Sequence, residues 1–454
     1  MKKKKEDTKP KEHKPNWREY TATVEDIERF LSDNVLLRHN VVAGRVECRI
    51  PDAWPSESGG DRGLREWLYN ELFNCSDPLP PDSGGQVWLP ISDRIVNTLW
   101  RALSKTKKVN AKDINQVIES DFSPDFNPFT FYLEHLPPWN GEDYILGMSV
   151  SVTVKGEVEE QMLFAQYLKK WLVGMVAGWV DPKAVNHEML ILIGEQGSYK
   201  TTWFNYLLPP ELQQYFRIKT NSSRMTKDDL LVLSEYGLVC YEELDTMKPS
   251  ELNQLKSAVT ATHVDERKPY GRYTEHRRHI ASFCGTGNNV QFLSDATGNR
   301  RWLPFEVESI DPPQEHPLDY AGIYAQAYAL YRQGFRYWFS REEIERLAVH
   351  NRQFETPRLE SELVQLYFRK PIGKEPGEFM SVAFALQIVG MGLTQKLSTV
   401  SLGRAFVELG FERKTFRNVR GYVVVRRSAE EMQSIRQVMA ACPSNTDADL
   451  TDVF

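Results

Sequence analysis

The chain has 454 residues, of which 41% are hydrophobic and 26% charged, and its formal net charge is -6. This length predicts two to four domains, and the composition is that of a globular protein. The net negative charge excludes a surface that is basic throughout, so nucleic-acid contacts are expected only from local basic patches.

The ends of the chain and its cysteines exclude several further classes. The five cysteines form no CxxC pair, which excludes a disulfide framework and a zinc site. The N-terminal "MKKKKEDTKPKEHKP" lacks the apolar stretch of a signal peptide, which predicts a disordered basic tail over 1–16 and a cytoplasmic protein. The longest apolar run, 171–180, is about half of a membrane span, so no membrane association is expected.

The first third of the chain is expected to precede the domain that carries the catalytic residues. Residues 17–115 combine a helical pattern, "VEDIERFLSDN", with the strand-like "VVAGRVECRI" and "QVWLPIS", which predicts a small α+β or mostly helical module. Residues 116–185 are expected to form a helical domain. It contains a tight turn at 139–141 and a long helix over 159–180, where apolar residues recur at helical spacing.

Three apolar runs predict the buried parallel strands of an α/β sheet domain over 186–310. They are "EMLILIG", "GLVCYEELD" and "HIASFCGTGNN", with helix-compatible segments between them. After this domain the sequence predicts a helical extension over 311–372, a winged-helix-like module over 376–428, and a C-terminal helix with an acidic tail over 429–454.

The first strand leads into "GEQGSYKTT", which has the frame of a phosphate-binding loop with Tyr199 in place of its second glycine. In such loops backbone N–H groups and the lysine bind phosphates, and the threonine hydroxyl binds Mg²⁺. Tyr199 strains the loop only if its φ is positive. The alternative is an ordinary turn with a solvated lysine. The predicted nucleotide-binding residues are Gly194, Gln196, Gly197, Ser198, Tyr199, Lys200, Thr201 and Thr202.

Polar residues follow the later strands in the order that nucleotide hydrolysis requires. Carboxylates after the second strand could hold a metal and polarise water, although acids are also common where helices begin. Asparagine after the third strand could orient water, although it is also a common turn residue. Paired arginines before the next strand could neutralise transition-state charge. The predicted catalytic residues are Lys200, Glu242, Glu243, Asn288, Arg300 and Arg301. The predicted Mg²⁺ ligands are Thr201, Glu242 and Asp245.

On these segments, together with "LPPWNGEDYI", "LKSAVTATHVDERKPYGR" and "FLSDATGNRRWLPFEV", the chain resembles the virulence-associated protein E family. These are P-loop ATPases of mobile elements and phages, related to superfamily three helicases. The resemblance covers about residues 120–315 and implies an AAA+ or superfamily three helicase-like fold that uses ATP and Mg²⁺.

The resemblance also implies roles for single residues. Lys200 and Thr201 would be the Walker A pair, and Glu242 and Glu243 the Walker B acids, with Asp245 an alternate. Asn288 would be the polar sensor. Arg300 or Arg301 would be an arginine finger that acts across a subunit boundary in a homo-oligomeric ring, usually a hexamer.

Two basic segments predict contacts with DNA. "DERKPYGRYTEHRRH" interleaves basic and aromatic residues, which suits a single strand bound without sequence preference, although its acids could instead pair with its arginines. "ERKTFRNVRGYVVVRR" follows an amphipathic helix, "LSTVSLGRAFVELGF", and this winged-helix outline could grip a duplex or dock a protein. The predicted DNA-binding residues are Arg267, Lys268, Arg272, Arg277, Arg278, Arg413, Lys414, Arg417 and Arg420.

The sequence therefore predicts an ATP-hydrolysing, DNA-associated motor that acts on single-stranded or forked DNA in the replication of a mobile element or prophage. An alternative is a nucleotide-gated loader or switch that remodels a DNA–protein complex without processive unwinding. A third is a DNA-binding regulator with a vestigial ATPase. No primase chemistry is recognisable, so a separate primase could be a partner.

Overall fold

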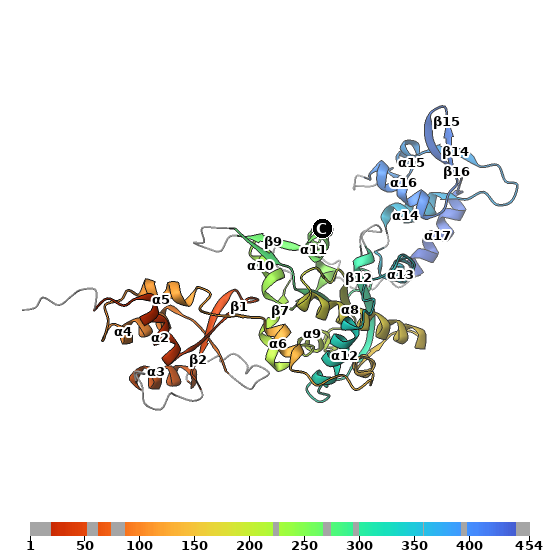
Figure 1. The fold of residues 1–454 in the computed structure, drawn as a ribbon. Coiled ribbons are helices and arrows are strands. Elements are labelled where there is room, and N and C mark those ends of the chain that lie inside the picture. The colour runs from red at the N-terminus through yellow and green to blue at the C-terminus, as the bar shows by residue number, and fades with distance from the viewer. Residues whose placement is uncertain are drawn as a thin grey trace, which may run out of the picture. The chain divides into compact units, whose positions relative to one another are not determined.

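The computed structural model describes residues 20–51, 62–73, 87–220, 227–266, 274–293, 299–356, 358–391 and 397–441. The chain divides into two compact units, residues 1–355 and 356–454 (Figure 1). The finer division predicted from the sequence stays a prediction.

The first unit begins with a four-stranded sheet of order β3-β2-β1-β4, packed against helices. The predicted helix "VEDIERFLSDN" is α2, whose N-cap Thr23 and Asp26 form a capping box. The sequence missed β1, and the strand predicted over 41–50 begins only at Arg45, because Val41 to Gly44 form the turn between β1 and β2. The elements of this part are α2 (Val24–Asn34), β1 (Leu36–Asn40), β2 (Arg45–Arg49), α3 (Arg62–Phe73), β3 (Leu89–Pro90), α4 (Asp93–Leu103), α5 (Ala111–Ile118) and β4 (Asp125–Phe126).

A six-stranded sheet of order β5-β12-β6-β11-β8-β7 forms the centre of the unit. Its strands are parallel except for β5, which pairs antiparallel with β12. All three predicted apolar runs are strands of this sheet, so the α/β prediction is confirmed. The strands are β5 (Val152–Val154), β6 (Met189–Ile193), β7 (Phe216–Lys219), β8 (Leu238–Tyr241), β11 (Ser282–Gly287) and β12 (Trp302–Ile310).

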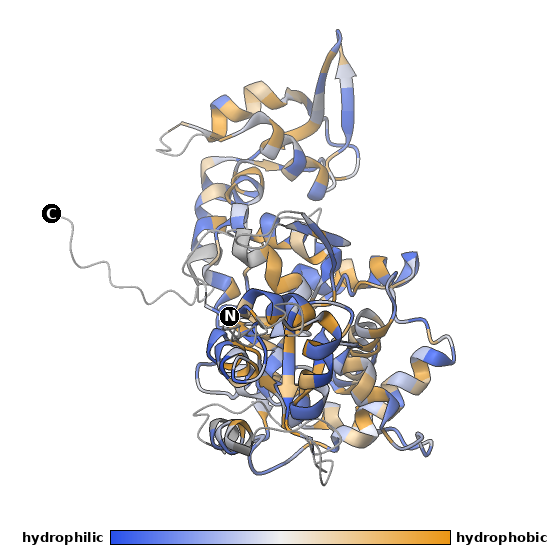
Figure 2. Ribbon diagram, turned by 60° about the vertical axis from the view of Figure 1, so that its left-hand side comes forward, coloured by the Kyte–Doolittle hydropathy of each residue, from blue (hydrophilic) through white to orange (hydrophobic). Residues whose placement is uncertain are grey.

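Helices cover both faces of this sheet. Leu190 and Leu192 of β6 enter one hydrophobic core together with residues of the long helix α8, whereas Ile191 and Ile193 enter a second core with residues of α11. Both pairs of side chains are fully buried, which explains why β6 is a continuous apolar run in the sequence. Many helices carry both hydrophobic and hydrophilic residues (Figure 2), as expected for helices with one buried face, whereas the second half of α8 is buried on all sides from Lys170 to Trp179.

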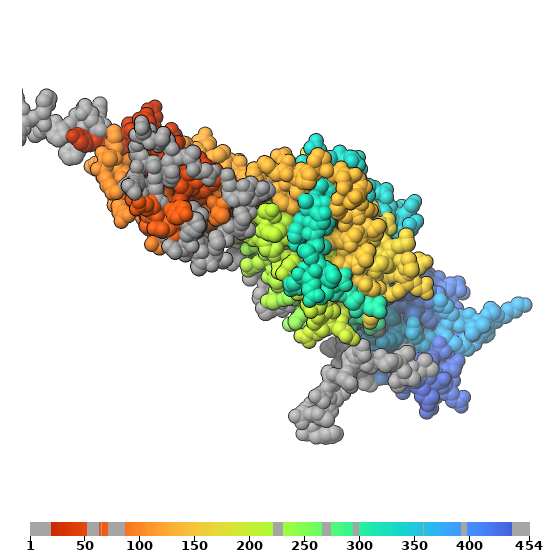
Figure 3. Space-filling model, turned by 90° about the horizontal axis from the view of Figure 1, so that it is seen from below, coloured from red at the N-terminus to blue at the C-terminus, as the bar shows by residue number. Residues whose placement is uncertain are grey.

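The remaining elements of the first unit lie before, between and after these strands. The predicted turn at 139–141 joins α6 to α7, and the predicted long helix is α8. On the face shown in Figure 3, residues after β12 lie beside those after α9, and Tyr320 Oη donates to the carbonyl oxygen of Tyr206 (2.8 Å). These elements are α6 (Pro128–Glu134), α7 (Tyr144–Val150), α8 (Val158–Val180), α9 (Lys200–Asn205), η1 (Pro210–Tyr215), α10 (Lys227–Glu235), η2 (Leu244–Thr246), α11 (Pro249–Val259), β9 (His263–Glu266), β10 (Glu275–Arg278), η3 (Asn299–Arg301), α12 (Tyr320–Arg332), α13 (Arg341–His350) and η4 (Asn351–Phe354).

The second unit has its own core and a sheet in which β16 pairs with β13, β14 and β15. The predicted amphipathic helix is α16, with Ser398 as its cap and Leu402 and Phe406 buried. The sequence predicts two strands in "ERKTFRNVRGYVVVRR" joined around 418–421, and the turn lies slightly earlier, at Arg417 and Asn418. Both residues have positive φ, as a two-residue hairpin turn requires. The elements are α14 (Leu359–Tyr367), β13 (Phe368–Arg369), β14 (Glu378–Ser381), α15 (Val382–Val389), α16 (Thr399–Glu408), β15 (Arg413–Phe416), β16 (Val419–Arg426) and α17 (Ala429–Ala441).

Within the described parts of the chain, no helix combines the length and the apolar character that crossing a membrane requires.

The tight packing of the central sheet predicts a contrast between two glycine substitutions. A Cβ on Gly285 of β11 would lie 2.7 Å from the Met189 methyl carbon and closer still to Leu244, so Gly285→Ala should lower the free energy of unfolding by about 1–3 kcal/mol. In α8 a Cβ on Gly178 has only an ordinary contact at 3.7 Å, so Gly178→Ala should be neutral or stabilising by about 0.5–1 kcal/mol. Denaturant unfolding measures both, and equal effects of the two substitutions would contradict this packing.

Candidate nucleotide-binding site

The predicted phosphate-binding loop connects the carboxyl end of β6 to α9 and begins in close contact with both neighbouring strands. The Gly194 backbone N–H donates to the Gly287 carbonyl oxygen of β11 (3.2 Å). A Cβ on Gly194 would lie 3.0 Å from the Val307 carbonyl oxygen of β12. A larger residue at position 194 would therefore require the backbone of β12 to shift by a few tenths of an ångström.

Two residues of the loop have left-handed backbone conformations. Gly197 has a φ of 85° and Tyr199 a φ of 59°. The position of Tyr199 thus does need a positive φ, which costs a residue with a Cβ roughly 1–2 kcal/mol. Its side chain is 44% exposed, and its carbonyl oxygen accepts the first hydrogen bond of α9, from the Trp203 N–H (2.7 Å). The tyrosine is accommodated with backbone strain while its ring faces solvent.

Lys200 is buried, and its ammonium group is directed back into the loop. It donates to the carbonyl oxygens of Gly194 (2.9 Å) and Glu195 (2.6 Å) and to Ser198 Oγ (3.1 Å). Burial lowers the pKa of Lys200, and the negative charge of Asp245 acts in the opposite direction. The other predicted loop residues, Gln196, Thr201 and Thr202, lie at the surface or half-buried on either side of Lys200.

Of the predicted acids, Asp245 lies closest to the end of β11. Its Oδ2 accepts the backbone N–H of Asn289 (3.0 Å), and its Oδ1 is buried with no hydrogen-bond partner among the described residues. Glu242 directly follows β8, where its N–H donates to the Lys219 carbonyl oxygen of β7 (3.0 Å). Glu243 has a φ of 53° and an exposed side chain. The structure therefore brings Asp245 and Lys200 to the same edge of the sheet.

The predicted sensor residue lies at that edge as well. Asn288 is exposed directly after β11, which lies between the loop strand β6 and the acid strand β8. The neighbouring Asn289 instead forms a local turn, because its Oδ1 accepts the Gln291 N–H (3.0 Å).

Arg300 and Arg301 lie at the opposite, amino-terminal edge. They directly precede β12, whose Trp302 pairs with Met189 at the start of β6. Burial, together with the positive charges of Arg301 and Arg300, lowers the pKa of His187, which also precedes β6. The five residues of β6 span roughly 17 Å, so the structure does not bring the arginines to the loop of their own subunit.

The predicted DNA-binding residues divide between a hairpin in the first unit and one in the second. Arg277 and Arg278 lie on β10 and contact other parts of the first unit, whereas Arg267, Lys268 and Arg272 lie outside the described residues. The other four are exposed on β15, on β16 or in the turn between them, and they are Arg413, Lys414, Arg417 and Arg420.

Comparison with known proteins identifies the domain that carries this site. The family model of the virulence-associated protein E-like domain matches residues 133–356, which confirms the family predicted from the sequence. No curated protein matches the chain.

Among solved structures, the chain is similar to the apo C-terminal region of NrS-1, with 10% identity and a TM-score of 0.49 over 88% of this chain and 98% of that chain. It is more distantly similar to a point mutant of Thermotoga maritima RuvB, with 11% identity and a TM-score of 0.24 over 60% of this chain and 94% of that chain.

The strain at position 199 yields a stability prediction. Tyr199→Gly should raise the free energy of unfolding by about 1 kcal/mol, because glycine adopts a positive φ without steric cost. Tyr199→Ala is the matched control, since it removes the ring but keeps the Cβ and should bring no such gain. If both variants unfold at the same denaturant concentration, backbone strain is not the cause.

Proposed function

Because residues 133–356 form a virulence-associated protein E-like domain, we propose that the protein is an ATP-hydrolysing, DNA-associated motor of the superfamily three helicase kind. The observation that carries this proposal is that Lys200 and Asp245 lie at the same carboxyl edge of the parallel sheet, where Asp245 Oδ1 is buried without a hydrogen-bond partner in the part of the chain that the structure describes.

The topology of the sheet favours nucleotide binding at this edge. From β6 the chain continues to β7, β8 and β11 on one side of the sheet and then crosses to β12 on the other side of β6. In open α/β sheets, ligands bind outside the carboxyl ends of the strands where the strand order reverses in this way. The loop from Gly194 to Tyr199 lies at that point and presents backbone N–H groups and one ammonium group, which suit a triphosphate.

The residues at the edge also fit a divalent cation. A buried carboxylate oxygen without a hydrogen-bond partner is costly unless a cation or a water is bound to it, and Asp245 Oδ1 is such an atom among the described residues. We therefore assign Mg²⁺ to Asp245 with the Thr201 hydroxyl, rather than to Glu242. Bound there, Mg²⁺ would neutralise charge on the transferred phosphate.

The remaining acids and the asparagine fit the activation of water. Glu242 and Glu243 directly follow β8, and Asn288 follows β11, so all three side chains emerge from the edge that also carries Lys200. A carboxylate that accepts a proton from water and an amide that orients this water are the groups that hydrolysis requires.

The position of the arginines favours hydrolysis between subunits. Arg300 and Arg301 lie at the far edge of their own sheet and so are available to the phosphate of a neighbouring copy. A head-to-tail contact of this kind closes into a ring when its rotation closes. A homo-oligomeric ring, in which each subunit completes the site of the next, is therefore the assembly that we propose.

The second unit supports contact with DNA. Its amphipathic helix α16 is followed by the β15–β16 hairpin, which is the order of elements in a winged helix. The hairpin exposes basic residues, and the Arg417 guanidinium lies over the ring of the exposed Phe416 (5.3 Å). Cationic groups beside exposed aromatic rings suit a nucleic-acid backbone and its bases. We propose that this hairpin binds the DNA on which the ATPase acts.

A nucleotide-gated loader or switch is the second candidate, and the hydrogen bonds of the Lys200 ammonium group favour it. All the hydrogen bonds of the ammonium group described here are made to the loop itself. Nucleotide binding must replace these bonds, so binding alone would change the loop. Turnover of ATP without strand separation would distinguish this switch from the motor.

Removing the lysine tests the nucleotide site directly. Lys200→Ala should weaken binding of Mg-ATP by roughly 10–100-fold, the effect of losing a charged hydrogen-bonding partner, and should abolish turnover. Lys183→Ala, which removes an exposed lysine before β6, is the control and should bind like the wild type. Calorimetric titration measures both, and equal affinities for the two variants would exclude this site.

Mixing variants tests the shared site. Lys200→Ala and the double variant Arg300→Ala with Arg301→Ala should each be inactive alone. In a random equal mixture, about a quarter of the subunit contacts in a closed ring join an intact loop to an intact arginine pair, so ATP turnover should reappear. A mixture that stays inactive although the subunits exchange would contradict catalysis between subunits.

A further inference from the structure

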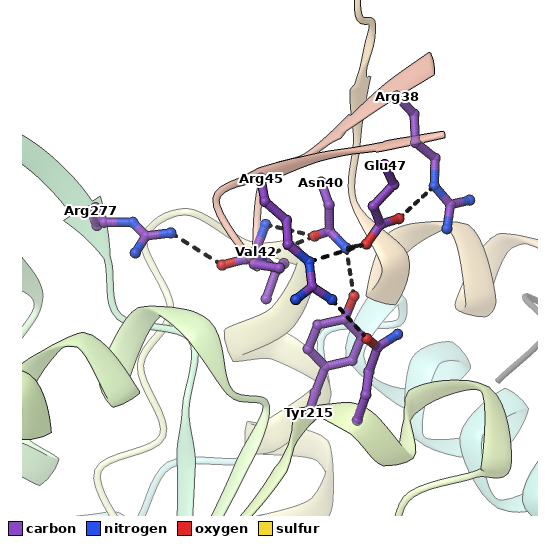
Figure 4. A network of polar contacts seen from close by, with 9 residues as sticks. Arg38, Asn40, Val42, Arg45, Glu47, Tyr215 and Arg277 are labelled. Carbon is purple, nitrogen blue, oxygen red and sulfur yellow. Dashed lines mark hydrogen bonds and ion pairs between the residues drawn. The ribbon is translucent and has the colours of Figure 1, made fainter. Parts of the chain in front are cut away.

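Arg277 of β10 makes two contacts that link three parts of the first unit. Its Nη1 donates to Glu235 Oε1 of α10 (2.7 Å), and its Nη2 donates to the Val42 carbonyl oxygen in the turn between β1 and β2 (3.2 Å; Figure 4). Its side chain is only 10% exposed. The guanidinium therefore faces the protein, although Arg277 belongs to a segment whose basic composition suggests contact with DNA.

The turn that Arg277 contacts is itself held rigidly. Asn40 is fully buried, and its Oδ1 accepts the N–H groups of Val42 (3.1 Å) and Ala43 (3.0 Å). Its Nδ2 donates to Glu47 Oε1 (2.8 Å) and to Tyr215 Oη (2.7 Å), which lies at the end of η1, directly before β7 (Figure 4). The Asn40 amide thus fixes the shape of the turn and joins it to the central domain.

Hydrophobic packing strengthens the same junction. The Val42 side chain is 4% exposed and belongs to the core that also contains Phe129, Trp179 and Tyr215. A buried apolar side chain beside a buried hydrogen-bond network gives the turn one defined position against the sheet. Arg277 thus connects β10 to a rigid support.

The neighbouring arginine anchors the hairpin on another side. The Arg278 guanidinium donates to the Gly178 carbonyl oxygen in the last turn of α8, and burial lowers the pKa of Arg278. The backbone of β10 pairs antiparallel with that of β9, and Arg277 lies opposite the buried Val264. The base of the β9–β10 hairpin is therefore attached to α8, to α10 and to the β1–β2 turn.

We propose that Arg277 is a positioning residue that couples the N-terminal β1–β2 turn to the β9–β10 hairpin, and that it does not bind phosphate itself. The role in DNA binding rests on the proposed function together with the single-stranded DNA contact that the sequence predicts for residues 265–279. The clamp, by which we mean the contacts of Arg277 with α10 and with the β1–β2 turn, does not depend on either. A planar guanidinium reaches two acceptors on different elements from two separate nitrogens, whereas a lysine would have to reach both from a single nitrogen. The orientation of the hairpin thereby depends on the N-terminal part of the chain.

Hydrogen exchange of the full chain without DNA tests the clamp. Arg277→Ala should speed amide exchange in both β10 and the turn at 40–44, because the two elements lose their common contact. Arg277→Lys should restore part of the protection, since the ammonium can reach one acceptor. The matched control Arg413→Ala, on the second unit, should leave both segments unchanged. Unaltered exchange in the turn of Arg277→Ala would overturn the coupling.

The salt dependence of DNA binding tests the positioning role. A residue that contacts phosphate contributes about one unit to the slope of log affinity against log salt, so its removal lowers the slope by about one. Arg277→Ala should lower the affinity for single-stranded DNA by the same factor at every salt concentration, with the slope unchanged. Arg413→Ala, which removes an exposed arginine proposed to contact phosphate, should lower the slope.

The two experiments separate the possible failures. A slope reduced by about one in Arg277→Ala would show direct phosphate contact and overturn the positioning role. Absence of DNA binding by the wild type would instead reject the proposed function, and the hydrogen-exchange result would still decide whether the clamp exists.

Discussion

The parallel pairing of β6 with β11 on one side and β12 on the other is the constraint from which the arrangement of the site follows. It brings the carboxyl ends of the loop strand and of the strand before Asn288 to one edge, and the residues before β12 to the opposite edge. Five fully buried apolar residues in β6 hold this pairing in place, with alternate side chains in two separate cores. Because a one-residue shift of the strand would exchange its side chains between the two cores and disturb the packing of both, the positions of Lys200 and of Arg301 are fixed relative to each other.

This geometry explains how one sheet can contribute to two sites. Lys200 and Asp245 meet at one edge, and the paired arginines lie about one strand length away. In the proposed mechanism a single subunit would bind phosphates without completing their neutralisation, so assembly would be a condition for turnover. The two hairpins differ in how they are held. The β9–β10 hairpin is attached to the β1–β2 turn through Arg277, whereas the β15–β16 hairpin belongs to a unit with its own core.

Much of the sheet domain could be predicted from the sequence because its strands are buried on both faces and therefore appear as unbroken apolar runs. The short strand β1, "LLRHN", could not, since it mixes polar and apolar residues and one of its side chains, Asn40, is buried for its hydrogen bonds. The sequence showed that Tyr199 was unusual, but whether it is strained depended on a φ angle that only the structure gives.

The site residues show the same limit. The acids after β8 were visible as a cluster, but only the fold shows that η2 carries Asp245 back toward β11, where its Oδ1 is buried without a hydrogen-bond partner in the described ranges of the chain. Arg277 looked like its basic neighbours in the sequence. Its contacts are made to residues 42 positions and 235 positions away, so no local pattern could have revealed them.

In the proposed site the Lys200 ammonium lies against a nucleotide phosphate at the carboxyl edge of β6. An acyl-phosphate derivative of ATP transfers its acyl group to a lysine beside the bound phosphates, and mass spectrometry identifies the labelled residue. If Lys200 lies beside the phosphates, it should be labelled, and excess Mg-ATP should prevent this labelling. An unlabelled Lys200 in folded protein, with other lysines labelled regardless of added ATP, would contradict it.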